Sequence, residues 1–155
     1  MKKALELQPD QPYVLNYLGY SWADHGVNVD LSLDYIERAI QQRPNDGYII
    51  DSMGWVLYKL GRFEEAVIHL EKAVELVPGD PIINDHLGDA YWRVGRKLEA
   101  GFQWQRALSN ADDVELIADI EDKILNGLSA KLKDLEQKAD ADVVIINETS
   151  ESLDQ

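Results

Sequence analysis

Residues 47–80 read GYIIDSMGWVLYKLGRFEEAVIHLEKAVELVPGD, and this stretch decides the fold because its small residues recur along the chain. Gly54 lies 35 residues after Gly19 and 34 residues before Gly88. Three other sets of markers show the same two intervals: Gly26, Gly61 and Gly95; Ala4, Ala39 and Ala73; Pro9, Pro44 and Pro78. A period of this length predicts an array of stacked units, each of them one supersecondary element.

The repeated glycines indicate what each unit is. Gly54 lies in a stretch of helical apolar spacing, where glycine costs about 1 kcal/mol relative to alanine, so we expect it to permit the close approach of a second helix. Ala73 is expected to serve the same contact from that helix. Gly61 stands where the first helix should end, since glycine supplies the left-handed residue after a last turn. The pattern therefore predicts an all-α fold of helical hairpins.

The period also predicts the organisation of the chain. First helices are expected at 12–25, 47–60 and 81–94, and second helices at 30–43, 63–77 and 97–109. The first unit is one residue longer than the others, and we place the extra residue at 27–30. The expected segments are a remnant of a preceding repeat at 1–11, three repeats at 12–46, 47–80 and 81–112, a capping helix at 113–138 and an acidic tail at 139–155. Because residues 1–8 match only the end of a second helix, we expect the chain to be the C-terminal piece of a longer array.

These units resemble the tetratricopeptide repeat family, whose 34-residue hairpin has an apolar-x-x-Leu-Gly-x-x-aromatic first helix. The residues that carry the resemblance are Leu15, Leu18, Gly19 and Trp22; Ile50, Met53, Gly54 and Leu57; Asn84, Leu87, Gly88 and Tyr91. The resemblance implies a right-handed superhelix whose first helices line a concave groove. The runs at 46–55 and 85–95 also look like the C-terminal repeats of large bacterial proteins of this family, some of them exported or lipid-anchored. They imply a bacterial adaptor or scaffold, in the cytoplasm or the periplasm.

Composition excludes several classes of partner and site. With 29 acidic and 15 basic residues the chain has a formal net charge of -14, which repels nucleic acid and anionic lipid surfaces. The absence of cysteine excludes thiolate metal sites and cysteine nucleophiles. The longest wholly aliphatic run, at 143–146, is far shorter than the roughly 20 residues that cross a bilayer, so no direct membrane insertion is expected.

The last third of the chain holds the strongest acidity. Ile117, Ile120 and Ile124 keep helical spacing in the expected capping helix, and Gly127 is a candidate break in it. The acidic tail surrounds the apolar island at 143–146. Three interpretations of this island stay open: a motif that adds a strand to a partner's sheet, a solvated tail, and docking on the chain's own last hairpin.

The sequence favours no catalytic chemistry. Phosphate-binding loops, nucleophile elbows and His-Glu-x-x-His motifs are absent from it, so neither an enzyme nor a cofactor is expected. His86 shares a helical face with Asp85 and Asp89, which raises the alternatives of a metal site or a polar groove lining. No second histidine stands in register with His86, which favours the lining.

The expected site is the concave groove. Positions 2, 5, 6, 9, 12 and 13 of each first helix should face it, and seven of these eighteen residues are Tyr or Trp although the whole chain has only 13 aromatic residues. The candidates are Tyr13, Asn16, Tyr17, Tyr20, Ala23 and Asp24; Tyr48, Asp51, Ser52, Trp55, Tyr58 and Lys59; Ile82, Asp85, His86, Asp89, Trp92 and Arg93. Trp55, Tyr58 and Trp92 are expected to form a continuous aromatic floor, with hairpin core as the alternative.

The charges in this groove indicate the partner. Cochaperone repeats hold an acidic C-terminus with a clamp of Lys, Arg and Asn, whereas the matching positions here are Asn16, Tyr20, Ser52, Ile82 and His86. A protein or extended peptide with apolar and basic residues therefore fits better. The expected function is a non-catalytic protein-interaction module. The rival is a structural module whose groove or truncated end packs on another copy.

Overall fold

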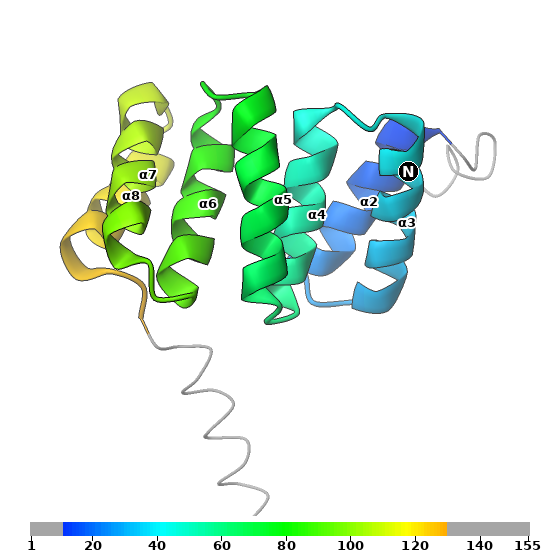
Figure 1. Ribbon diagram of the computed structural model, residues 1–155, viewed down its shortest axis with the longest axis horizontal. Coiled ribbons are helices and arrows are strands. Elements are labelled where there is room, and N and C mark those ends of the chain that lie inside the picture. The colour runs from blue at the N-terminus through cyan, green and yellow to red at the C-terminus, as the bar shows by residue number, and fades with distance from the viewer. Residues whose placement is uncertain (1–10, 130–155) are drawn as a thin grey trace, which may run out of the picture. The chain divides into compact units, whose positions relative to one another are not determined.

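The computed structural model describes residues 11–129, which form α-helices and contain no strand (Figure 1). Within this part of the chain, three hairpins are followed by a further helix. The hairpins are α2 (Pro12–Asp24) with α3 (Val29–Gln42), α4 (Gly47–Lys59) with α5 (Phe63–Leu76), and α6 (Pro81–Arg93) with α7 (Lys97–Asn110); the last helix is α8 (Val114–Asn126). The six hairpin helices begin and end within one residue of their expected bounds. The expected all-α fold is confirmed.

Side chains placed just before the first helices determine where these helices begin. Asp46 Oδ1 accepts hydrogen bonds from the backbone N–H groups of Tyr48 (3.0 Å) and Ile49 (3.3 Å) at the start of α4. Asp80 Oδ1 accepts one from Ile83 (3.0 Å) at the start of α6. Such caps satisfy backbone donors that have no partner within the helix.

The turns inside the hairpins explain the one-residue difference between repeats. Gly61 ends α4 with a φ of 77°, a conformation that favours glycine. Three residues, 60–62, separate α4 from α5, whereas four residues, 25–28, separate α2 from α3. Asn28 in the longer turn has a φ of 49° and directly precedes α3. The extra residue of the first repeat therefore lies in this turn.

Each hairpin is held by the contact of a glycine with a large residue of the second helix. A Cβ added to Gly54 would lie 2.5 Å from Leu70 Cγ, and one added to Gly19 would lie 2.6 Å from Ile36 Cγ1. Both large residues are fully buried. Any side chain at these glycines would push the two helices apart, so close packing explains glycine inside a helix.

The hairpin core includes the apolar residues of the repeat pattern in the first helices. Seven such residues of the first helices are each at most 8% exposed: Leu15, Leu18, Ile50, Met53, Leu57, Leu87 and Tyr91. Their burial uses one side of each first helix. The residues on the other side are thereby left to contact the next first helix or solvent.

Helix α8 follows the third hairpin after a short connection. Asp113 Oδ1 accepts a hydrogen bond from the Leu116 N–H (2.9 Å), and Ile120 is fully buried. The helix ends at Asn126, and Gly127 has a φ of 67°. Residues 1–10 of the expected remnant at 1–11, residues 130–138 of the expected capping helix and the acidic tail with its apolar island lie outside the described residues.

Candidate functional site

The residues predicted to face a groove lie on α2, α4 and α6, and we call the surface that they define the first-helix face. Their exposure differs strongly along it. The exposed ones are Tyr13, Tyr17, Asp24, Tyr48, Lys59 and Ile82. The partly buried ones are Asn16, Tyr20, Trp55, Trp92 and Arg93. The buried ones are Ala23, Asp51, Ser52, Tyr58, Asp85, His86 and Asp89.

An aromatic stack joins α4 to α6 at the centre of this face. The Trp55 ring is stacked on Tyr58, with centroids 5.0 Å apart, and on the His86 imidazole, 4.1 Å away. The ammonium of Lys59 lies 4.9 Å from the Trp55 centroid. The Trp55 indole N–H points to Asp24 Oδ1 of α2 at 3.4 Å. Trp55 therefore contacts residues of α2, α4 and α6. Part of its ring surface is covered by these contacts and is not available to a partner.

His86 is fixed by a carboxylate of the preceding repeat. Its Nδ1 donates to Asp51 Oδ1 at 2.9 Å, and both side chains are buried. Burial alone would lower the pKa of His86, but the charge and hydrogen bond of Asp51, with the charges of Asp89 and Asp85, raise it above the ordinary value. The protonated form of His86 is thus more favoured than in a free imidazole, and its ring lies against the Asp51 carboxylate.

Lys123 of α8 approaches the third repeat's end of the face. Its ammonium lies 3.0 and 3.1 Å from the two carboxylate oxygens of Asp85, and 3.1 Å from Asp89 Oδ1. Asp119, one turn earlier on α8, contributes an oxygen at 3.0 Å. The Lys123 side chain is 11% exposed, so its ion pairs with buried Asp85 and Asp89 are largely shielded from water, whereas the Asp119 side chain is 57% exposed. The sequence analysis predicted that Asp85 and Asp89 would face a partner. In the structure both carboxylates are instead paired with Lys123 of the same chain.

One lysine does not balance three carboxylates, and the pKa values reflect this. Burial and the charge of Asp85 raise the pKa of Asp89 to about 6, although Lys123 opposes the shift. Burial also raises the pKa of Asp85 against the effect of Lys123. The pKa of Lys123 is raised as well, because the charges of Asp89 and Asp85 outweigh its burial. Both buried carboxylates are thus easier to protonate than an exposed aspartate.

Sequence reasoning missed Lys123 as a residue of this face. Its spacing could have identified it as a face residue. Lys123 lies 34 residues after Asp89, which is the interval between equivalent positions of neighbouring repeats. Helix α8 therefore continues the register of the first helices. The glycines Gly19, Gly54 and Gly88 have no fourth member, because Asp122 occupies the equivalent position in α8. The glycine pattern therefore did not reveal that α8 continues the register.

Trp92 occupies a different environment from the expected continuous floor. Its ring contacts Trp104 of α7, with centroids 5.6 Å apart, and Lys97 of α7 lies 4.7 Å from its centroid. Trp104 is 1% exposed and donates its indole N–H to Asp89 Oδ1 at 3.0 Å. Trp55 and Tyr58 lie together as predicted. Trp92 instead packs on α7, within its own hairpin, and does not extend the aromatic floor.

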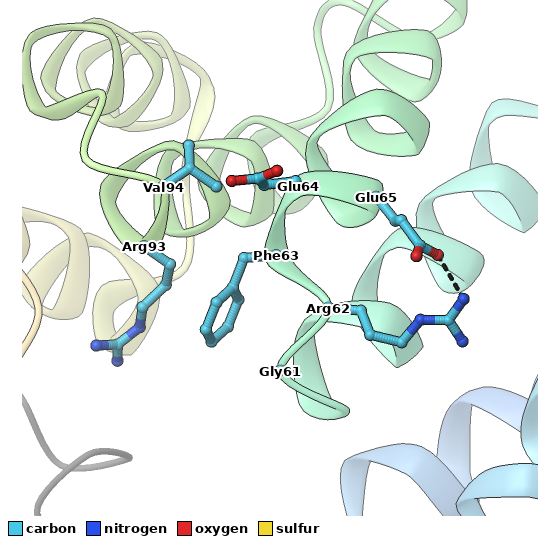
Figure 2. Close-up of a pocket in the computed structure, with 7 residues that line it drawn as sticks. All are labelled: Gly61, Arg62, Phe63, Glu64, Glu65, Arg93 and Val94. Atoms are coloured by element: carbon cyan, nitrogen blue, oxygen red, sulfur yellow. Dashed lines mark hydrogen bonds and ion pairs between the residues drawn. The ribbon is translucent and has the colours of Figure 1, made fainter.

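The end of α6 borders a surface hollow of about 380 Å³ at the turn between α4 and α5 (Figure 2). Figure 2 shows Arg93 and Phe63 on one side of it and the Arg62–Glu65 ion pair, at 2.5 Å, on the other. Arg93 Nε donates to the Tyr58 hydroxyl at 3.1 Å. Of the predicted site residues, only Arg93 lines this hollow.

The first-repeat end of the face is open. Tyr13, Tyr17 and Tyr48 are 50%, 53% and 57% exposed. The Tyr13 hydroxyl donates to Asp46 Oδ2 at 3.3 Å, which links α2 to the cap of α4. Burial, with the charges of Asp24 and Asp51, raises the pKa of the neighbouring Tyr20 to about 12. Aromatic rings and nearby negative charge are thus combined at this end.

Two further features are absent from residues 11–129. No group of three or more His, Asp or Glu side chains is arranged there to hold a metal ion. In the same part of the chain, no helix has the length and apolarity that crossing a membrane requires.

Comparisons with known proteins agree with this architecture. A family model described as TPR repeat matches residues 54–95. The TPR repeat-containing protein PA4667 of Pseudomonas aeruginosa is 37% identical over 59 residues, which are 38% of this chain and 10% of that protein. The matched stretch thus spans about a tenth of that relative's length.

Two solved structures share the fold. TTC0263, a thermophilic TPR protein of Thermus thermophilus, superimposes with a TM-score of 0.68 at 22% identity, covering 80% of this chain and 69% of that one. The first TPR of Spaghetti (RPAP3), bound to the HSP90 peptide SRMEEVD, gives a TM-score of 0.62 at 18% identity, covering 74% of this chain and 94% of that one. The helical hairpins of this chain therefore have the fold of tetratricopeptide repeats.

Proposed function

We propose that this chain is a non-catalytic protein-interaction module that binds an extended segment of a partner along its first-helix face. The exposure of three tyrosines on neighbouring first helices carries this proposal. Tyr13 and Tyr17 lie one turn apart on α2, and Tyr48 lies at the start of α4. Exposed aromatic rings provide large contact area at a low cost in side-chain entropy, which suits them to bind a partner.

Charge supports a partner with basic and apolar residues. Asp24 is exposed at the end of α2, and its charge and that of buried Asp51 act on Tyr20, one turn after Tyr17. The third repeat's end keeps an excess of carboxylate even after Lys123 is bound. Opposite charge across an interface speeds association and selects partners. A lysine or arginine of the partner would also gain a cation–π contact with an exposed tyrosine ring.

The peptide of the Spaghetti complex offers a matched pair of probes. The acidic peptide SRMEEVD is compared with SRMKKVK, in which its three acidic residues become lysine. We expect the basic version to bind at least about tenfold more tightly, because the face presents carboxylates and tyrosines. Fluorescence anisotropy at two salt concentrations measures both dissociation constants. Tighter binding of SRMEEVD would contradict the proposed polarity.

The variant Tyr17→Ala tests whether the basic peptide binds at the exposed tyrosines of the first-helix face. We expect it to weaken binding of the basic peptide, whereas Tyr35→Ala on α3 serves as a matched control outside the face. Equal loss in both variants would place binding elsewhere.

The rival function is self-association through the same face. Sedimentation velocity across a concentration series distinguishes the two. A dimer that Tyr17→Ala dissociates would favour the structural role, whereas a monomer that binds the basic peptide supports the proposed module.

A further inference from the structure

The ion pairs of Lys123 have the geometry of a complete site for a primary ammonium group. A lysine ammonium has three N–H donors and no acceptor. Asp85, Asp89 and Asp119 each place a carboxylate oxygen 3.0 to 3.1 Å from its nitrogen. Each carboxylate can therefore receive one of the three protons.

Two independent elements build this site. Asp85 and Asp89 lie one turn apart on α6, where both are buried at 6% and 5% exposure. Asp119 and Lys123 lie one turn apart on α8. Asp89 is also oriented by the Trp104 indole N–H, which occupies one of its oxygens. Asp89 is thus held in place by a contact that does not involve the lysine.

We propose that Asp85, Asp89 and Asp119 form a primary-ammonium site, that Lys123 fills it from within the chain, and that Lys123 thereby decides which part of the first-helix face accepts a partner's basic side chain. While Lys123 is bound, the third repeat's end is closed to such a side chain. Basic residues of the partner are then directed to the open end, at Tyr17 and Tyr48. This selectivity rests on the proposed function, whereas the ammonium site itself does not.

Removal of Lys123 tests the site directly. Lys123→Ala leaves the carboxylates unpaired and removes the lysine stem, which opens a path for a small cation. We expect n-butylammonium chloride to raise the thermal midpoint of this variant by several degrees more than sodium chloride does at equal ionic strength. The wild-type protein should respond equally to both salts, because its site is filled.

Lys72→Ala is the matched control. Lys72 lies on α5 with a 47% exposed side chain, and its carboxylate partner Glu75 is 4.0 Å away. This variant removes the same charge outside the face, and we expect no specific response to butylammonium. If Lys123→Ala does not fold in sodium chloride, folding on addition of butylammonium is the same positive result. An equal response of Lys123→Ala to the two salts overturns the ammonium site.

The selectivity is tested with the lysine-rich peptide SRMKKVK. Lys123→Ala should bind it about tenfold more tightly than wild type, because the emptied site accepts a peptide lysine. Lys72→Ala should bind like wild type. Equal affinities in all three proteins would overturn the selectivity. If wild type fails to bind the peptide and Lys123→Ala responds to butylammonium, the proposed function fails while the ammonium site stands.

Discussion

The two ends of the first-helix face are built from equivalent helical positions, yet they differ in what they offer a partner. Tyr17 of the first repeat and His86 of the third occupy the same position of their repeats. Tyr17 is 53% exposed, whereas His86 is 6% exposed and paired with Asp51. The open end presents aromatic rings to solvent. The closed end is a shielded network of charges.

The difference shows that the neighbouring first helix decides the role of a position. Asp85 and Asp89 are covered because α8 follows the third repeat in the same register and places Lys123 against them. Position 9 of the repeat is Tyr20 in α2, Trp55 in α4 and Asp89 in α6. The same backbone geometry therefore supports a stack at one repeat and an ion pair at the next. The following predictions test this contrast, from the largest expected effect to the smallest.

Trp104→Ala should reduce the free energy of unfolding by about 3 to 5 kcal/mol, because it leaves a cavity against Gly88 and removes the indole donor of Asp89. Urea denaturation measures the loss. Leu98→Ala on the same helix, at a site 76% exposed, should change it by less than about 0.5 kcal/mol. Similar losses in the two variants would mean that Trp104 is not part of the third hairpin's core.

Lys123→Met should reduce the free energy of unfolding by about 3 kcal/mol, because it leaves buried Asp85 and Asp89 without their cation. Lys72→Met, which removes an exposed lysine, should leave it almost unchanged. The same urea titration compares them. A loss as small as that of the control would show that α8 contributes little to the closed end.

Trp55→Ala and Trp92→Ala should differ in effect. Trp55 lies in the stack of the face, so its loss should weaken partner binding by about 2 kcal/mol. Trp92 packs on Trp104, so its loss should lower the melting temperature more than it weakens binding. Thermal melting and peptide titration are measured on both. If both variants melt as early as Trp104→Ala, these rings are core and the binding role of Trp55 is refuted.

Stability should rise, by on the order of 1 kcal/mol, as pH falls from 8 to 5. Asp89 has a folded pKa of about 6, above its ordinary value, so the folded state takes up a proton before the unfolded chain does. The raised pKa of His86 acts in the same direction, since its stabilisation is complete below the ordinary histidine pKa and is lost as pH rises through the folded pKa. Urea midpoints across this range measure the effect. Asp89→Asn should flatten the profile, and an unchanged slope would rule out Asp89 as its source.

Tyr17→Ala should have the smallest effect on stability, within about 0.5 kcal/mol, because half of the side chain is already in solvent. Its effect on binding of the basic peptide should be larger than its effect on unfolding. A melting temperature several degrees lower would show instead that Tyr17 supports the first hairpin.

The residues that pack within a hairpin were predictable from sequence. The glycine and alanine markers placed the six hairpin helices within one residue of their bounds, because a glycine inside a helix is explained by the close packing that it permits. In the third hairpin the same close packing joins Gly88 to Trp104. The candidate face was predicted as a set of helical positions, but the environment of each residue was not. Trp92 and Lys123 are the two clearest examples.

The sequence by itself determined the period, the all-α hairpins and the residues of their cores, since these depend on contacts between neighbours within one repeat. Only the tertiary structure decided which face residues stay open, because that depends on partners 31 to 38 residues away. Lys123 lies one repeat interval after Asp89, but this spacing alone does not show that it pairs with Asp85 and Asp89. Their pairing became visible only when α8 was placed beside α6, where a carboxylate that is shielded from water requires a cation to be stable.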